Sequence, residues 1–156
     1  MKVGIIVHSK TGNTFSVAEK LKERLTGDGT IVELRRIEPV GGEPAGIKDL
    51  SAITFEPSPE VTGFDRLIFA GPVRGFSMSP ILGAYINKLP SLKNQKVDLF
   101  VTQSFPKPFL GGNQAISQMT AACTGKGAII GKTGIVNNMS KKRQSMIEDV
   151  IERLSK

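Results

Sequence analysis

Short runs of apolar, β-branched residues alternate along the chain with segments of helical periodicity. The sequence predicts strands at Val3–Val7, Thr30–Ile37, Arg66–Gly71, Lys96–Thr102 and within Gly127–Val136, and the first and third of these are expected to be buried. The periodic segments predict helices at Phe15–Leu25, from Ser79-Pro80 to Leu89, and at Asn113–Thr124. A last helix, capped by Ser140, would turn inward Met146, Ile147, Val150, Ile151 and Leu154. Because parallel strands are joined by right-handed crossovers, this alternation predicts an α/β fold with a parallel sheet between helices.

The chain of 156 residues fits one domain, residues 1–156. Residues 38–63 are rich in Pro, Gly and Glu and have weak periodicity, so they predict only a short helix or turns around Ile47–Phe55. Cys123 is the single cysteine, which excludes an internal disulfide and indicates a reducing compartment. No apolar run approaches the roughly 20 residues of a membrane helix. We therefore expect a cytoplasmic protein.

The net charge of +7 is unevenly distributed. Residues 1–65 contain 8 Lys or Arg and 10 Asp or Glu, whereas residues 66–156 contain 13 and 4. Asp98 is the only acid between Arg66 and Ile147. This bias favours an anionic ligand or an acidic partner, or it is simply a basic surface. No motif indicates binding to nucleic acid.

The loop "HSKTGNT", His8–Thr14, follows the first predicted strand and opens the first predicted helix. A helix N-terminus presents unpaired N–H groups and partial positive charge, which suits an anion. The hydroxyls of Ser9, Thr11 and Thr14 would add donors, and Gly12 would let the backbone approach closely. In a parallel sheet, ligands bind at the carboxyl ends of the strands, where this loop lies. The loop therefore predicts a phosphate site.

Two common phosphate motifs are absent. A dinucleotide loop would read G-x-G-x-x-G, and this loop contains one glycine. The segment "GKGAIIGKT", Gly125–Thr133, approaches the pattern G-x-x-x-x-G-K-[ST], but its first required glycine falls on Lys126 and no helix follows.

"SKTGNT" resembles the phosphate loop of the flavodoxin family, whose pattern is [ST]-x-T-G-x-T after the first strand. "DRLIFAGPVRGFSMSP" and "VDLFVT" look like that family's third and fourth strands with their flavin loops. The resemblance covers nearly the whole chain. It implies non-covalently bound flavin mononucleotide (FMN) and a three-layer α/β/α sandwich with five parallel strands in the order 2-1-3-4-5.

By this resemblance, three loops would bind the cofactor. The phosphate would contact Ser9, Lys10, Thr11, Gly12, Asn13 and Thr14. The flavin ring would lie beside Pro72, Val73, Arg74, Gly75 and Phe76, where Gly75 would ease a peptide flip. A second ring loop would comprise Thr102, Gln103, Ser104 and Phe105. Helix capping and an ordinary glycine turn are the plainer interpretations of the first two loops.

The chain departs from the family in its aromatic residues and charges. It has no Trp, and Tyr85 lies on a helix, so the available ring stackers are Phe76, Phe105 and Phe109. His8 is expected to form a local hydrogen bond, and Cys123 to lie inert in the core. Family members that carry electrons are acidic around the flavin, whereas this chain has Arg74 and Lys107 there. Cations near the ring would stabilise the reduced anion and raise its potential.

Three functions are compatible with these features. The first is an FMN-binding electron-transfer protein, which would serve an acidic, ferredoxin-like protein or a small-molecule acceptor. The second is a small reductase that passes electrons from NAD(P)H to a quinone, with Arg74 and Lys107 receiving the dinucleotide phosphates. The third is a binding module without redox activity, which the intact hydroxyls of the phosphate loop argue against. The first is the function that we predict.

Overall fold

Five parallel strands form the centre of the molecule in the order β2-β1-β3-β5-β6. The computed structural model describes residues 1–43, 50–56, 58–104 and 111–156. The strands are β1 (Lys2–Val7), β2 (Ile31–Arg36), β3 (Arg66–Arg74), β5 (Lys96–Gln103) and β6 (Ile129–Asn137). The two-residue strand β4 (Ser77–Met78) pairs antiparallel with the end of β3. Without β4, the order is the predicted 2-1-3-4-5.

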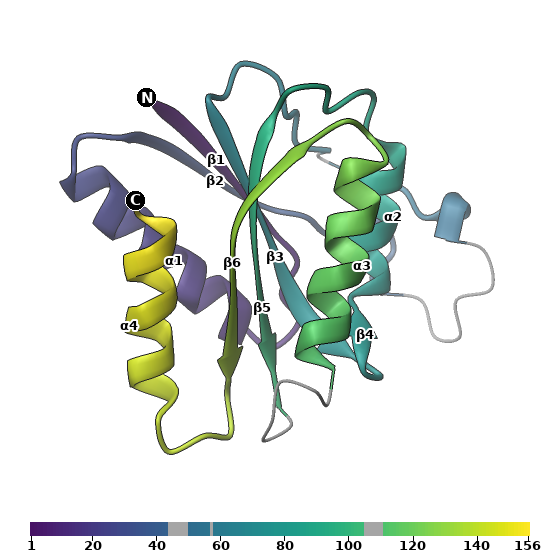
Figure 1. Ribbon diagram of the computed structural model, residues 1–156. Coiled ribbons are helices and arrows are strands. Elements are labelled where there is room, and N and C mark those ends of the chain that lie inside the picture. Colours follow the sequence, from purple (N-terminus) through teal and green to yellow (C-terminus); the bar gives the residue numbers. More distant parts are fainter. Residues whose placement is uncertain (44–49, 57, 105–110) are drawn as a thin grey trace.

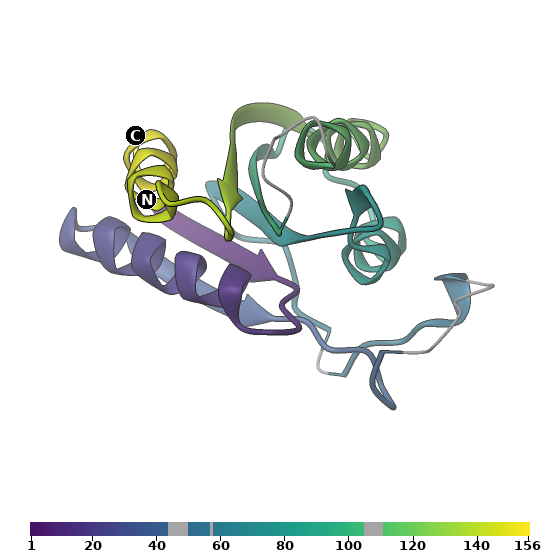
Figure 2. The same ribbon diagram turned by 90° about the horizontal axis from the view of Figure 1, so that it is seen from below.

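Helices cover both faces of this sheet (Figure 1). On one face lie α1 (Asn13–Gly27) and α4 (Arg143–Leu154), and on the other lie α2 (Pro80–Lys88) and α3 (Gly112–Thr124). Figure 2 shows the three layers from the carboxyl end of the sheet. The predicted three-layer α/β/α sandwich is therefore confirmed.

The sheet separates two apolar cores because side chains alternate between its faces. In β3, Leu67 and Phe69 pack in the α2 and α3 core, whereas Ile68 and Ala70 pack in the α1 and α4 core. All four are completely buried. This explains why the central strands read as continuous apolar runs.

The sequence predicts the capping residue at the start of α2 correctly, but not the one at the start of α4. The Ser79 hydroxyl accepts a hydrogen bond from the Leu82 amide at 3.2 Å and Pro80 follows, as predicted. The predicted Ser140 cap is wrong, because the cap position of α4 is Lys142 and no side chain caps it. Ser140 instead accepts from the Lys142 amide within the preceding turn. Met146, predicted to face inward, is only partly buried.

The segment after β2 returns along α2. It contains a short 3₁₀ helix, Leu50–Ala52, which falls within the region predicted to hold a short helix or turns. Phe55 contacts the ring of Tyr85 edge to face, and the Tyr85 hydroxyl donates to the carbonyl of Pro59. Residues 47–49 lie outside the described residues. Tyr85 is thus a core residue that anchors this segment.

Two expectations concern single features of the chain. Cys123 is fully buried in α3, and burial raises the pKa of its thiol to about 12, as expected for an inert core residue. Among the helices of the described residues, none combines the length and apolar character needed to cross a membrane.

Candidate functional site

The loop between β1 and α1 is shaped by Ser9 and Gly12. Gly12 adopts a left-handed conformation, with φ of 92°, and occupies the cap position of α1. The Ser9 hydroxyl accepts from the amides of Gly12 at 3.1 Å and Phe15 at 3.3 Å. Ser9 is 5% exposed, so its side chain closes the loop upon itself. The capping interpretation therefore accounts for the Ser9 hydroxyl.

The start of α1 presents donors that are not used by the fold. The amides of Asn13 and Thr14, its first two helical residues, donate to no other described residue, as is usual for a helix start. No acidic side chain lies in the first turn. The helix start therefore retains the partial positive charge that favours an anion.

Two of the predicted loops meet through a pair of buried threonines. The Thr14 hydroxyl lies 2.7 Å from the Thr102 hydroxyl at the end of β5. Each of these residues is 1% exposed. This contact joins the first turn of α1 to the carboxyl end of the sheet.

A cavity of about 310 Å³ opens where the three predicted loops converge. It is lined by Lys10, Thr11, Asn13, Thr14, Pro72, Val73, Arg74, Thr102, Gln103, Ser104 and Asn138. The structure therefore brings most of the predicted residues around one space at the carboxyl ends of β1, β3 and β5. Ser9, Gly12, Gly75 and Phe76 do not line it, and Phe105, Lys107 and Phe109 lie outside the described residues.

The second predicted loop is a tight hairpin. β3 continues to Arg74, which pairs with Ser77 of β4, so only Gly75 and Phe76 form the turn. Their φ angles are 55° and 66°, the pattern of a type I′ turn. The Phe76 side chain is 48% exposed at the hairpin tip. Gly75 thus adopts a positive φ as part of a hairpin turn, and the peptide flip expected beside a flavin stays a prediction.

Gly111 packs directly against this hairpin. Its φ is 125°, and a Cβ atom there would lie 2.6 Å from Val73 Cγ1 and 2.9 Å from Phe76 Cα. A larger residue would push the hairpin away from the start of α3. This close approach fixes Val73, which lines the cavity.

His8 is buried between Ser79 and Glu43. Its Nδ1 lies 2.6 Å from the Ser79 hydroxyl, and its Nε2 lies 3.9 Å from Glu43 Oε2. Burial lowers the pKa of His8 to about 4, although Glu43 acts in the opposite direction. A neutral ring with its proton on Nε2 would face that carboxylate favourably. His8 thus forms the local hydrogen bond that the sequence led us to expect.

Glu43 forms an ion pair that the sequence did not indicate. Its Oε1 lies 2.8 Å from Arg74 Nη1, so the cation beside the cavity has a carboxylate partner. Glu43 lines an adjacent cavity of about 580 Å³, with Lys10 shared between the two. Residues 38–63 lack periodicity, so no sequence signal placed Glu43 there. Asn138 was also missed, although its position just after β6, at the carboxyl edge, could have indicated it.

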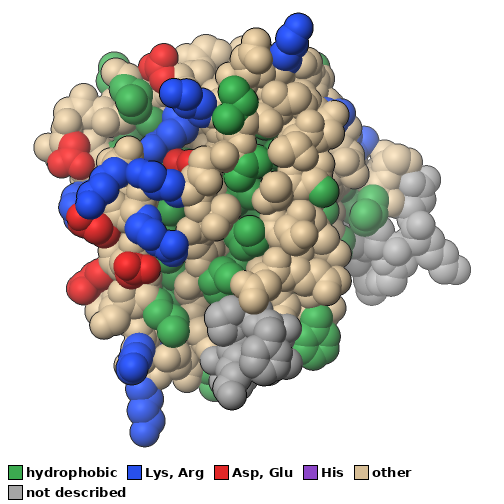
Figure 3. Space-filling model, viewed as in Figure 1, with side chains coloured by type: hydrophobic (Ala, Val, Ile, Leu, Met, Phe, Trp, Pro, Cys, Tyr) green, Lys and Arg blue, Asp and Glu red, His purple; other side chains and the backbone are tan. Residues whose placement is uncertain are grey.

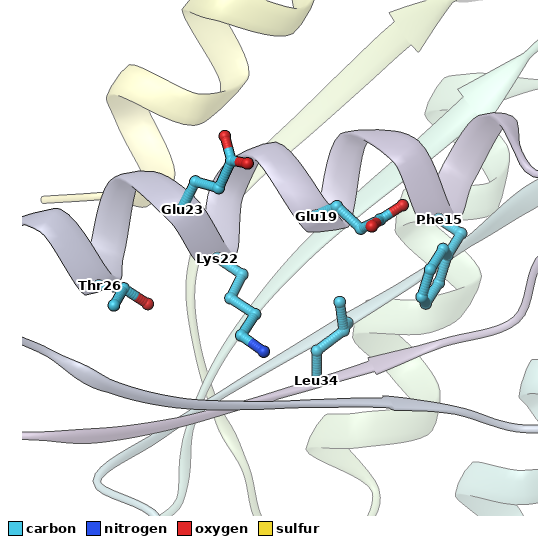
Figure 4. Close-up of a pocket in the computed structure, with 6 residues that line it drawn as sticks. All are labelled: Phe15, Glu19, Lys22, Glu23, Thr26 and Leu34. Carbon is cyan, nitrogen blue, oxygen red and sulfur yellow. The ribbon is translucent and has the colours of Figure 1, made fainter.

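A further groove runs along α1 and faces Leu34 of β2 (Figure 4). Its volume is about 610 Å³, and its α1 residues are Phe15, Glu19, Lys22, Glu23 and Thr26. Phe15, Lys22 and Thr26 lie on the side of α1 that faces Leu34, whereas the Glu23 carboxylate projects away from Leu34 (Figure 4). The groove lacks the convergence of loops seen at the carboxyl edge, so we do not assign it as the site.

The folds of solved structures agree with this arrangement. The flavodoxin of Megasphaera elsdenii matches with a TM-score of 0.65 at 20% identity, covering 98% of each chain. Flavodoxin 2 of Bacillus cereus matches with a TM-score of 0.65 at 16% identity, covering 99% of this chain and 98% of that one. The protein has a flavodoxin-like fold.

A WrbA-like flavodoxin of Agrobacterium tumefaciens shares the flavodoxin-like fold too, with a TM-score of 0.66, 11% identity and coverage of 99% and 94%. No protein-family model matches the sequence, and comparison with curated proteins finds no similar sequence. The likeness therefore concerns the fold.

Proposed function

We propose that this protein binds FMN at the carboxyl edge of its sheet and serves as an electron-transfer protein. The convergence of three loops on the 310 Å³ cavity, with the donors of the α1 start at its rim, is the observation that supports this most strongly. The donor set suits a phosphate dianion. It comprises the ammonium group of Lys10, the side chains of Thr11 and Asn13, and the helix amides.

Different residues of the cavity would contact different parts of the nucleotide. Thr11 and Asn13 would hydrogen-bond the phosphate, and Lys10 would add charge. Val73 and Gln103 would border the rest of the ligand, with the Gly75–Phe76 hairpin at one side. When bound, the flavin would supply the redox chemistry, while the chain supplies orientation and electrostatics.

The residues that line the cavity suit the phosphate end of FMN better than its flavin ring. Among the described residues, the cavity lining contains no aromatic side chain, and Phe76, which is 48% exposed, is not part of it. The predicted stacking by Phe76, Phe105 and Phe109 therefore stays a prediction. An acidic redox protein is the partner that we propose, because the half of the chain that forms two of the three loops is basic.

Ligand titration tests the proposal. The purified protein should show flavin absorbance, and the apo protein should quench FMN fluorescence on binding. Riboflavin, which lacks the phosphate, should bind at least tenfold more weakly, because the charged hydrogen bonds at the loop are lost. Equal binding of the two ligands, or of neither, would contradict the phosphate assignment. Rapid NADPH oxidation with a quinone acceptor would instead favour the reductase.

One substitution addresses the loop directly. Thr11 is exposed, and its hydroxyl has no partner among the described residues. Thr11→Ala should therefore weaken FMN binding about tenfold while changing the free energy of unfolding by less than about 0.5 kcal/mol. Thr26→Ala, at the far end of α1, is the matched control and should bind FMN normally. Equal FMN affinities in the two variants would contradict a phosphate role for Thr11.

A further inference from the structure

An ion pair between distant parts of the chain joins a residue of one cavity to a residue of the adjacent cavity. Arg74, at the end of β3, lines the candidate FMN cavity, and Glu43, from the turn after β2, lines its neighbour. The side chains are 33% and 19% exposed, and the ion pair distance is 2.8 Å. This partial burial favours a stronger interaction than an ordinary surface pair makes.

The other charged groups nearby do not compensate Arg74. Lys10 and Arg36 are cations, and Arg36 Nε has its own partner, Glu38 Oε1, at 3.5 Å. His8 is neutral at physiological pH because burial lowers its pKa to about 4. Glu38 and Glu56 also line the neighbouring cavity, but within the described residues Glu43 is the only carboxylate that forms an ion pair with Arg74.

We propose that Glu43 is a positioning residue that holds the Arg74 guanidinium at the cavity wall and cancels most of its charge toward the bound flavin. This inference rests on the proposed FMN site. A reduced flavin carries more negative charge than an oxidised one, so an uncompensated cation stabilises the reduced form. Arg74 paired with Glu43 would stabilise the reduced flavin only weakly. The reduction potential of the flavin should then be lower than the potential expected from the sequence, because that expectation treated Arg74 as unpaired.

Potentiometric titration of the FMN-loaded protein tests this role. Glu43→Gln should shift the two-electron equilibrium toward reduced flavin about tenfold, which is about 30 mV. Arg74→Gln should shift it in the opposite direction, and the double variant should lie near the wild type, because the two charges act as a pair. Glu38→Gln removes a carboxylate from the same segment and is the matched control, with a much smaller expected shift, because its partner Arg36 does not line the candidate FMN cavity. A Glu43→Gln potential equal to the control would overturn the inference.

A second measurement needs no flavin. His8 is the only histidine of the chain, so its NMR titration is free of overlap. Glu43 raises the pKa of His8, whereas Arg74, Arg36 and Lys10 lower it. Arg74→Gln should therefore raise the pKa of His8 in the apo protein, and Glu43→Gln should lower it. If neither variant moves that titration, the pair is not formed as described. If the wild type binds no FMN but the titration shifts, the proposed function fails and the ion pair stands.

Discussion

The two ends of the sheet both hold buried polar groups, but they use them differently. At the amino end, Asp98 of β5 is 4% exposed and forms an ion pair with Arg66 of β3 at 3.3 Å. Its Oδ1 also accepts from the Lys132 amide at 2.8 Å. Arg66 in turn donates to the carbonyl of Leu154 at the end of α4. These contacts join four elements, β3, β5, β6 and α4.

The local strand geometry depends on this carboxylate. The pairing of β5 with β6 shifts register beside Asp98, so that Gly131 and Lys132 both oppose it. A Cβ atom on Gly131 would lie 2.4 Å from Asp98 Oδ1, which explains the glycine. Because its Oδ1 accepts from the Lys132 amide, Asp98 stabilises this bulge.

At the carboxyl end, by contrast, donors face a space. The amides at the start of α1 and the side chain of Thr11 have no partner among the described residues, and they surround the 310 Å³ cavity. Size does not distinguish the two ends, because the amino-end cavity is larger, at about 760 Å³. Unused donors at a helix start, rather than burial or volume, are therefore our reason for placing the proposed site at this end.

The net charge of a segment also does not identify a binding surface. The basic excess of residues 66–156 suggested a single positive surface. Figure 3 shows Lys and Arg side chains interleaved with acids over α4 and the neighbouring part of α1. Glu152, for example, pairs with Arg24 at 2.7 Å and Lys156 at 3.1 Å. On this face, much of the positive charge is thus compensated locally.

Asp98→Ala is the substitution with the largest expected effect on the comparison between the two ends of the sheet. It would leave Arg66 buried without its carboxylate and the Lys132 amide without an acceptor, so the free energy of unfolding should fall by about 3–5 kcal/mol. Urea unfolding measures this change. Asp149→Ala removes an exposed partner of Arg153 and should cost less than about 0.5 kcal/mol. If Asp98→Ala is as mild as this control, the amino end is not the structural centre that we describe.

A change of intermediate size is expected on acidification, because of His8. Its pKa is about 4 in the folded protein and near 6.5 when unfolded, so the unfolded chain binds the proton first as pH falls. The stabilisation is present above pH 6.5 and is lost between pH 6.5 and 4, with about 2 kcal/mol lost from pH 7 to 5. Unfolding of the wild type and of His8→Asn at both pH values measures it. Equal losses in both would show that His8 does not stay neutral.

Much of this molecule could be predicted from its sequence, and the reasons are local. The apolar runs of β1, β3 and β5 are buried on both faces, so any parallel sheet must contain them. Ser79-Pro80 is a helix start because the hydroxyl and the fixed φ act within one turn. The loop Lys10–Thr14 is identifiable because its residues are consecutive and its position after a strand fixes its place in the sheet.

What the sequence could not predict depends on contacts between distant residues. Glu43 reaches Arg74 only because the segment after β2 folds over His8. Thr14 was predicted to contact the phosphate and Thr102 to belong to the second ring loop, and nothing in either loop indicates that their hydroxyls contact each other. The Ser140 prediction failed because a good capping residue was followed by a turn, which delayed the helix to Arg143.

The smallest of these changes concerns the threonine pair at the functional end. Thr102→Val would leave the buried Thr14 hydroxyl unpaired and should cost about 1–2 kcal/mol in the free energy of unfolding, measured in urea. The double variant Thr14→Val with Thr102→Val should cost less than the sum of the single changes, because no hydroxyl is then left without a partner. Additive costs would mean that the two hydroxyls are not coupled. Each hydroxyl could then bind a ligand independently. The Thr14 and Thr102 hydroxyls would have to be counted among the unused donors at this end of the sheet.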